Sequence, residues 1–313
     1  MSCSAAIVFP GQGSQHLNML SQGSIFDIAK SHAYSHLVQC CSDLISLDFF
    51  DLVENGPEDL LNQTSITQPV LLLISYFHYQ NLIEKIDIDP IMFAGHSLGE
   101  YSALIAANSI SIEDGLSLVR KRGVLMEEAP KGSMAAILGL DITTIQSICS
   151  EVSINESMHV QCANINSPSQ TVISGNHEAV EITQELCLKK GAKRALKLNV
   201  SIASHSLLMK SLHDEFHKFL STIEINIPLI PVIHNVDNNT SSDLDAIKNL
   251  LVEQLYSPVQ WVNICNKIAT FNLPAIECGP GKVLGGLFKA NRVNDYFSTS
   301  DTNFYEKILT HVK

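Results

Sequence analysis

Residues 95–99 have the sequence Gly-His-Ser-Leu-Gly, a GxSxG pattern that can present a serine as a nucleophile. The apolar run Ile91–Ala94 precedes this pattern, and the helical pattern Leu98–Asn108 follows it. A sharp turn between a strand and a helix exposes the serine hydroxyl, and the flanking glycines relieve crowding where the backbone doubles back. The helix N-terminus favours negative charge that develops on a substrate. We therefore predict that Ser97 is a catalytic nucleophile.

A serine nucleophile needs a general base, and the twelve histidines leave that choice open. His205 lies between a predicted strand and a predicted helix, where the chain would return to the domain that carries the serine. His96 is adjacent to Ser97, and neighbouring side chains in a tight turn point in different directions. Two pairs of histidines four residues apart fall on predicted helices, where we interpret them as solvated faces rather than metal ligands: His32 with His36, and His213 with His217. No metal site is predicted.

The elements that would position these side chains alternate between short apolar runs and helical patterns, which is typical of an α/β fold. Four apolar runs predict buried strands of a parallel sheet: Ala5–Phe9, Ile91–Ala94, Leu229–His234 and Ala275–Cys278. Six stretches predict helices: Gln68–Glu84, Leu98–Asn108, Ile112–Ala129, Ser206–Leu220, Asp243–Tyr256 and Val259–Phe271.

The stretch between about residues 132 and 200 has a different order of elements. Its predicted strands are Met134–Leu140, Val160–Asn164, Thr171–Gly175 and Arg194–Val200, and its predicted helices are Ile142–Val152 and Glu178–Lys190. This βαββαβ order is the ferredoxin-like motif, and its position inside a parallel-sheet protein indicates an insertion. We predict a large domain formed by residues 1–131 and 201–313, an inserted domain formed by residues 132–200, and a binding cleft between them.

Composition excludes several classes of function. The chain has 313 residues, of which 45% are hydrophobic and 17% charged, so extensive disorder is excluded. Its net charge is −12 and its lysines and arginines are spread along the chain, which argues against a nucleic-acid partner. The longest strongly apolar run, about Val70–Phe77, is too short to span a membrane.

The N-terminus and the cysteines indicate a compartment. The first residues lack a basic region and their apolar run ends at Pro10, so we predict no signal peptide. None of the eight cysteines belongs to a CxxC pair, and most lie in apolar stretches. We expect reduced, buried thiols in a cytoplasmic protein.

Seven segments occur in an order that closely resembles the malonyl-CoA:acyl carrier protein transacylases of bacterial fatty acid synthesis, and they span nearly the whole chain. The segments are Phe9–Gln15, Gly95–Leu104, Arg120–Gly123, Asn166–Pro168, Ser204–His205, Tyr256–Trp261 and Glu277–Gly281. The resemblance implies an α/β-hydrolase-like domain with an inserted ferredoxin-like domain, which agrees with the order of elements above. It also implies an enzyme that moves a malonyl group from malonyl-CoA to the phosphopantetheine thiol of acyl carrier protein.

The resemblance implies a role for each of seven residues. The acylated serine would be Ser97, the base His205, the oxyanion hole the backbone N–H groups of Gln12 and Leu98, and the substrate-binding residues Arg122, Gln260 and Asn166. The family uses no cofactor and no metal beyond its two substrates. Gly279–Lys282 is similar to part of a phosphate-binding loop, but Val283 stands where such a loop has serine or threonine.

Arg122 lies on an apolar stripe of its predicted helix, with Leu118, Val119, Leu125 and Met126 three and four residues away. An isolated buried charge is costly, so the guanidinium needs a partner. The sequence leaves two partners for Arg122 possible: a protein carboxylate in a structural ion pair, or the malonyl carboxylate in the cleft. The planar guanidinium suits a bidentate pair with either.

Three other functions stay open. A serine thioesterase would share the GxSxG pattern, but its histidine usually lies near the C-terminus, where only His311 occurs. An acyltransferase that serves a polyketide synthase would share the motifs. A non-catalytic scaffold that binds the carrier would not need serine, histidine and arginine together.

We expect a monomer whose carrier protein docks on a local concentration of basic residues. An acidic carrier would need such a patch because the chain itself is acidic. One concentration comprises Lys189, Lys190, Lys193, Arg194 and Lys197, and a second comprises Lys282, Lys289 and Arg292.

Overall fold

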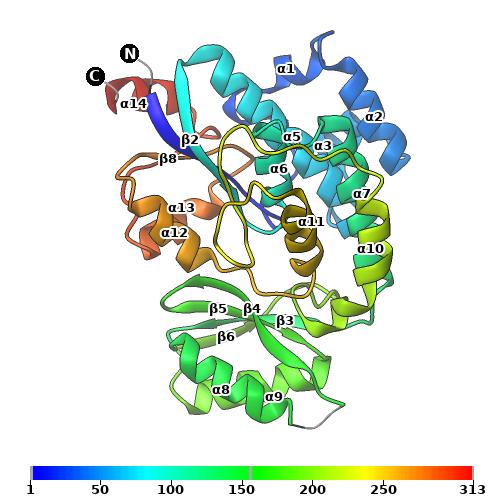
Figure 1. Cartoon of the computed structure of the whole chain (residues 1–313), viewed down its shortest axis with the longest axis vertical. Coiled ribbons are helices and arrows are strands. Elements are labelled where there is room, and N and C mark those ends of the chain that lie inside the picture. Colours follow the sequence, from blue (N-terminus) through cyan, green and yellow to red (C-terminus); the bar gives the residue numbers. More distant parts are fainter. Residues whose placement is uncertain (1–2, 155–156, 312–313) are drawn as a thin grey trace.

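The computed structural model describes residues 3–154 and 157–311, and it contains two β-sheets with helices packed around them (Figure 1). One sheet is parallel and has the strand order β7-β2-β1-β8-β9. The other is antiparallel and has the order β4-β5-β3-β6. The predicted α/β class with a parallel sheet is confirmed.

The parallel sheet is covered on both faces, which explains why its strands appear in the sequence as continuous apolar runs. Its strands are β1 (Cys3–Phe9), β2 (Ile88–Gly95), β7 (Val232–Ile233), β8 (Ala275–Glu277) and β9 (Tyr296–Ser298). Alternate residues of β1 point into different cores, with Ile7 on one face and Ala6 and Val8 on the other.

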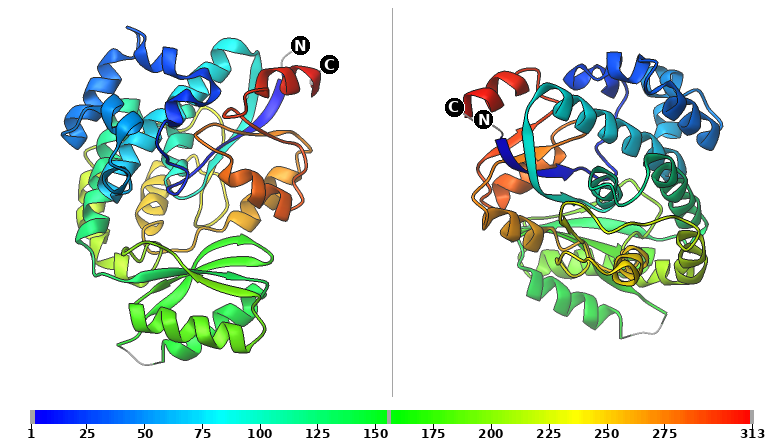
Figure 2. Two further views of the ribbon diagram at one scale, coloured as in Figure 1. Left: turned by 180° about the vertical axis from the view of Figure 1, so that it is seen from behind. Right: turned by 45° about the horizontal axis from the view of Figure 1, so that its top comes forward.

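Helices cover the two faces of this sheet, as the two views of Figure 2 show. The longer helices that share a core with Ile7 include α5 (Thr64–Lys85), α6 (Gly99–Ala106), α7 (Ile112–Glu128), α10 (His213–Leu220), α11 (Leu244–Glu253) and α14 (Phe304–His311). The helices that share a core with Val8 are α12 (Trp261–Ala269) and α13 (Val283–Ala290).

The antiparallel sheet follows the predicted βαββαβ order. Its elements are β3 (Ser133–Leu138), α8 (Ile142–Val152), β4 (Val160–Ser167), β5 (Gln170–Gly175), α9 (His177–Lys189) and β6 (Arg194–Lys197). Both helices pack on one face, in a core that includes Ile137 and Ile173. The opposite face carries Met134 and Val172 and points toward the parallel sheet, as Figure 1 shows.

Helix α5 begins at Thr64, four residues before the predicted start, and contains Pro69 in its second turn. Proline cannot donate a hydrogen bond to the carbonyl four residues earlier, which is that of Ser65. The side chain of Arg120 on α7 donates to this carbonyl oxygen instead, at 2.7 Å. Contact between α5 and α7 therefore permits a proline that the local sequence would place at the helix start.

The region between β1 and α5 contains short helices, and the sequence predicted only a helix around His32 and His36. They are the 3₁₀ helix η1 (Met19–Ser24), α1 (Phe26–Lys30), α2 (Ser35–Ile45), α3 (Phe49–Asn55) and α4 (Glu58–Leu61). Most contain fewer than two turns, which is too short for a helical period to be recognised. His32 precedes α2, so its predicted place on one helix with His36 is wrong. His213 and His217 do share a helix, α10, and their rings stack 6.0 Å apart.

Other predictions were too long: the strand predicted at Arg194–Val200 ends at Lys197, and two further elements differ more. The strand predicted at Leu229–His234 is reduced to β7, an edge strand that pairs with β2, and Pro231 directly before it has no N–H to donate. The helix predicted at Ser206–Leu220 divides into the 3₁₀ helix η2 (Leu207–Leu212) and α10.

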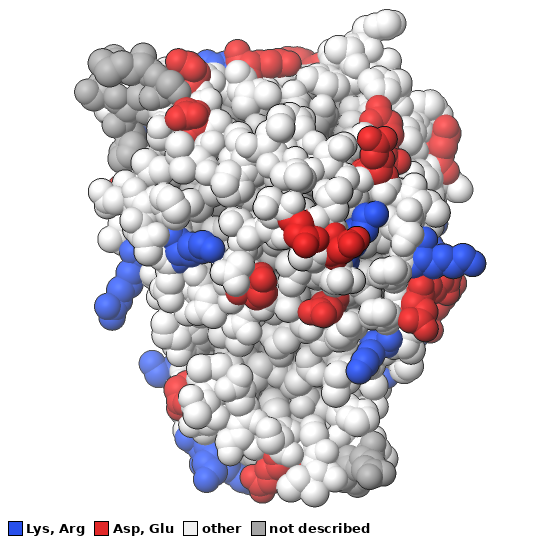
Figure 3. Space-filling model, viewed as in Figure 1, with Lys and Arg blue, Asp and Glu red and all other residues white. Residues whose placement is uncertain are grey.

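Seven of the eight cysteines are buried, and all eight are free. Among the described residues, no helix combines the length and the apolar character that crossing a membrane requires. On the face shown in Figure 3, acidic and basic side chains are interspersed, and several basic ones lie together at the lower left.

Candidate active site

The strand-to-helix turn after β2 forces Ser97 into a left-handed backbone conformation, with φ of 53°. A Cβ atom on Gly95 would lie 1.9 Å from a backbone carbon of Gly99, and one on Gly99 would lie 2.2 Å from the carbonyl oxygen of Phe9. Only glycine fits at both positions. The turn thus presents the Ser97 side chain at the carboxyl end of β2, just before α6.

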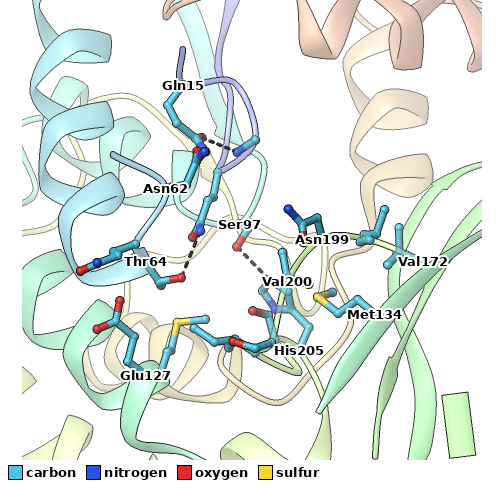
Figure 4. Close-up of a pocket in the computed structure, with 18 of the residues that line it drawn as sticks. Gln15, Asn62, Thr64, Ser97, Glu127, Met134, Val172, Asn199, Val200 and His205 are labelled. Carbon is cyan, nitrogen blue, oxygen red and sulfur yellow. Dashed lines mark hydrogen bonds between the residues drawn. The ribbon is translucent and has the colours of Figure 1, made fainter. Parts of the chain in front are cut away.

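His205 lies against this serine, although it is 108 residues away in the chain. Its Nε2 atom is 2.8 Å from Ser97 Oγ (Figure 4), and its Nδ1 atom is 2.7 Å from the backbone carbonyl oxygen of Gln254. A carbonyl oxygen only accepts, so Nδ1 carries the proton and Nε2 is free to accept the serine proton. This is the tautomer that a general base requires.

The surroundings of His205 keep its imidazole neutral. Burial, followed by the charge of Arg122, lowers the pKa of His205 to about 3, against the opposing effect of its bond to the Gln254 carbonyl. The ring is therefore available as a base at neutral pH.

Arg122 is buried on α7 and its guanidinium is held by neutral groups. It donates to Gln68 Oε1 at 2.9 Å and to Gln254 Oε1 at 3.1 Å, and Nη2 is 3.4 Å from Ser97 Oγ. Among the described residues it forms no ion pair with a carboxylate, and Nε has no acceptor. The alternative of a structural ion pair therefore receives no support. A buried cation beside the serine hydroxyl can bind an anionic group of an acyl substrate.

Gln12 and Leu98 flank the serine from two segments. The loop that contains Gln12 lies against the turn, since a Cβ atom on Gly11 would be 2.3 Å from the His96 carbonyl oxygen. Neither the Gln12 nor the Leu98 backbone N–H takes part in a hydrogen bond within the described part of the chain. The N–H of Ser97 itself is occupied, because it donates to Asn235 Oδ1 at 2.7 Å.

Two of the predicted substrate-binding residues lie elsewhere. Gln260 precedes α12, where its side chain accepts a 3.4 Å bond from Asn263. Asn166 is buried behind the site, and its Oδ1 is 2.8 Å from His96 Nε2. Neither is one of the described residues that line the cavity.

Gln254, which the sequence did not single out, is the glutamine that contacts the predicted nucleophile, base and arginine. Its backbone holds His205, its Oε1 accepts from Arg122, and its Nε2 donates to the Ser97 carbonyl oxygen at 3.1 Å. Leu250 and Leu251 lie four and three residues earlier. A polar residue on an apolar stripe was the available signal, as it was for Arg122.

A cavity of about 770 Å³, a volume typical of small-molecule sites, lies between the antiparallel sheet and the turn that follows β2. The antiparallel sheet contributes Met134 and Val172, whose side chains approach the cavity opposite Ser97 (Figure 4). Ser97, Arg122 and His205 all line this cavity, so the structure brings together the predicted nucleophile, base and carboxylate partner.

Comparisons with known proteins agree with this geometry. Residues 6–284 match the family described as "Acyl transferase domain". The chain is 43% identical over 303 residues to the malonyl CoA-acyl carrier protein transacylase of Escherichia coli strain K12, and this match covers 95% of each chain. It is 38% identical over 313 residues to the same-named protein of Bacillus subtilis strain 168, which covers 98% of this chain and 97% of that one.

Solved structures show the same fold. The malonyl CoA-acyl carrier protein transacylase of Coxiella burnetii superposes with a TM-score of 0.91 at 36% identity, and the match covers 99% of this chain and 98% of that one. A type II PKS acyl-carrier protein in complex with its malonyl-transacylase contains a chain that matches with a TM-score of 0.90 at 41% identity, over 99% of this chain and all of that one.

Proposed function

This chain belongs to the acyl transferase domain family, and we propose that it is a malonyl-CoA:acyl carrier protein transacylase that supplies malonyl groups for fatty acid biosynthesis. The relatives that cover nearly the whole chain carry this name. The observation that carries the proposal is the arrangement of Ser97, with a neutral histidine 2.8 Å away and a buried arginine 3.4 Å away. A nucleophile, a base and a cation are what transfer of a carboxylate-bearing acyl group requires.

In the first half-reaction, Ser97 Oγ attacks the thioester carbonyl of malonyl-CoA while His205 Nε2 takes the serine proton. The N–H groups of Gln12 and Leu98 stabilise the oxyanion of the tetrahedral intermediate. Collapse of that intermediate breaks the C–S bond, and the proton on His205 passes to the departing CoA thiolate. Arg122 pairs with the malonyl carboxylate throughout.

In the second half-reaction, the phosphopantetheine thiol of acyl carrier protein gives its proton to His205 and attacks the serine ester. Collapse returns the proton to Ser97 and releases malonyl carrier protein. One thioester replaces another, so the exchange is nearly isoenergetic. Nothing is oxidised or reduced, and the residues named can move every proton, so we propose that no cofactor is used beyond the two substrates.

We propose further that the molecule is an α/β-hydrolase-like domain, residues 1–131 and 201–313, with a ferredoxin-like domain inserted at residues 132–200. The strand-to-helix turn at Ser97 supports the first assignment. The βαββαβ order and the antiparallel order β4-β5-β3-β6 support the second.

One chain supplies every group named in the reaction, which supports action as a monomer. The seven buried free thiols support a cytoplasmic location. We propose no nucleic-acid partner and no membrane partner, and the acidic balance of the chain supports the first of these.

A second candidate, supply of malonyl groups to a polyketide synthase, is supported by the likeness to a malonyl-transacylase in complex with a type II PKS acyl-carrier protein. Transfer rates to fatty-acid and polyketide carriers decide between the two. A thioesterase and a non-catalytic scaffold are disfavoured, because neither gives Arg122 a function.

Intact-mass spectrometry tests the proposal directly. The protein is mixed separately with malonyl-CoA, acetyl-CoA and methylmalonyl-CoA, then with phosphopantetheinylated carrier. Malonyl-CoA should leave one malonyl group on the protein, the carrier should remove it, and Ser97→Ala should acquire none. Rapid hydrolysis without carrier would indicate a thioesterase, and an adduct on Ser97→Ala would contradict the assigned nucleophile.

A further inference from the structure

Glu100, on the first turn of α6, is a carboxylate that is fully buried and does not line the cavity. Its Oε2 accepts from Gln254 Nε2 at 2.6 Å and from the backbone N–H of Asn235 at 3.1 Å. Its Oε1 is 2.8 Å from His234 Nδ1. A buried carboxylate with three partners orients the groups around it, because moving any of them would leave charge unsatisfied.

The bond from Gln254 fixes which way the Gln254 amide faces. Nε2 donates both to Glu100 and to the Ser97 carbonyl oxygen, so Oε1 points to Arg122. If the Gln254 amide were turned by 180°, its NH₂ group would face the Arg122 guanidinium. Both groups only donate, so the Arg122 N–H would then have no acceptor there. Glu100 therefore determines that Arg122 meets an oxygen.

The same link keeps the negative charge of Glu100 away from direct contact with Arg122. A carboxylate bound directly to the guanidinium would occupy the donors that a substrate carboxylate needs. Gln254 instead presents its neutral Oε1 atom to Arg122, so the guanidinium is oriented without a negative charge in contact with it. His234 donates to Glu100 from Nδ1: burial is the largest single effect on the pKa of His234 and lowers it, but the bond and charge of Glu100, with Asp237, raise the pKa overall.

The carboxylate is also connected to the nucleophile. Asn235, whose backbone N–H donates to Glu100, accepts from the Ser97 N–H at 2.7 Å and donates to the Gly95 carbonyl oxygen at 2.7 Å. The Asn235 branch supports the turn that every acyl substrate uses. The Gln254 branch reaches both the Ser97 carbonyl oxygen and Arg122, and of these two only Arg122 is specific to a carboxylate-bearing acyl group.

We propose that Glu100 is a positioning residue for acyl selectivity: through Gln254 it holds the Arg122 guanidinium in the orientation that binds a carboxylate on the acyl group. The inference rests on the proposed function of Arg122 as the partner of the malonyl carboxylate. A purely structural Glu100 would support transfer of all acyl groups equally.

The test compares kcat/KM for acylation by malonyl-CoA and by acetyl-CoA in the wild-type protein and in Glu100→Gln. A glutamine has no charge and one acceptor oxygen for three partners, so the Gln254 amide is no longer held in one orientation. The ratio of malonyl to acetyl kcat/KM should fall by about tenfold, the effect of one lost hydrogen bond to a charged group. Glu277→Gln is the matched control, since Glu277 is equally buried but lies on β8, and its ratio should stay at the wild-type value.

A double-mutant cycle tests the route. In a Gln254→Met background, which keeps the backbone carbonyl that holds His205, Glu100→Gln should change the ratio no further. If circular dichroism shows that Glu100→Gln is unfolded, Glu100→Asp is measured instead. Aspartate keeps the charge but has a shorter side chain, and the same ratio of kcat/KM values is compared.

An unchanged ratio, or an equal loss for both substrates, overturns the inference. Arg122→Ala is measured alongside to separate the two proposals. If Arg122→Ala lowers the ratio and Glu100→Gln does not, only the positioning role fails. If Arg122→Ala leaves the ratio unchanged, the proposed function of Arg122 fails with it.

Discussion

His205 is placed where protonation is disfavoured, and this makes a prediction about pH. Because the pKa of His205 is lowered to about 3, its imidazole should remain neutral and basic well below the usual histidine value of 6.5. The rate constant for acylation by malonyl-CoA should therefore stay level between about pH 8 and about pH 5. Rapid-quench mass spectrometry measures it. A fall centred near pH 6.5 would contradict the assignment, and His205→Ala should be slower by about 10²–10⁴-fold at every pH.

Arg122 offers a prediction about substrate choice. Arg122→Ala should cost malonyl transfer about 2–5 kcal/mol, the range for breaking a buried charge-assisted pair. Acetyl transfer should be unchanged or improved, since acetyl has no carboxylate. Arg122→Lys should restore malonyl transfer only in part, because an ammonium cannot form the bidentate pair. Steady-state kinetics with both substrates decides, and equal losses in a folded protein would indicate a structural role.

At the scale of elements, the turn between β2 and α6 depends on close backbone contact with β1. A Cβ atom on Gly99 would lie 2.2 Å from the Phe9 carbonyl oxygen, so Gly99→Ala should force the strand and the helix apart. We expect a loss of about 1–3 kcal/mol in the free energy of unfolding, together with loss of acylation. Urea denaturation measures the first effect.

Gly286 provides the control for this prediction. It lies within α13, and a Cβ atom there would meet nothing within 4 Å. Gly286→Ala should stabilise the protein by up to about 1 kcal/mol, because alanine is the better helix former. Equal destabilisation by the two substitutions would show that the turn is not specially constrained.

At the scale of the whole molecule, the predicted carrier-docking patch lies at the end of the antiparallel sheet. Lys197 forms an exposed 2.9 Å ion pair with Glu181, whereas Lys193 and Arg194 are exposed next to it at the start of β6. Charge reversal at Lys193 and Arg194 should raise the apparent KM for carrier protein with little effect on malonyl-CoA, and should weaken the salt dependence of transfer. Unchanged carrier kinetics would point instead to the patch of Lys282, Lys289 and Arg292, where Lys282 already pairs with Asp301.

Stability should depend on pH through buried groups throughout the fold. Burial lowers the pKa of His78 and of His205 to about 3, so the unfolded chain binds more protons than the folded protein below pH 6.5. Stability is therefore lost as pH falls from 6.5 toward 3. Glu277 acts in the opposite sense between pH 7 and 4.5, because burial raises its pKa to about 7.

The two effects oppose each other above pH 4.5, so the steepest loss is expected below it. Urea midpoints measured across this range test the prediction. His78→Asn, which cannot take up the proton, should show a shallower acid limb than the wild-type protein. A steeper limb in the variant would be the contrary result.

The sequence by itself determined the features that depend on local pattern. The GxSxG turn between an apolar run and a helical pattern located Ser97, and the apolar neighbours of Arg122 at three and four residues showed that it is buried. The βαββαβ order was also predicted, because each of its elements is long enough to show its period. Three helices between β1 and α5, namely α1, α3 and α4, were missed because each has fewer than two turns.

Only the tertiary structure decided which polar groups meet. It brought His205 within 2.8 Å of Ser97, and it placed Gln254, which the sequence did not single out, against Arg122. It also joined Glu100 to Asn235, 135 residues away. The physical reason is that hydrogen bonds between distant segments depend on how helices pack on a sheet to within a few tenths of an ångström, and no local period in the sequence carries that information.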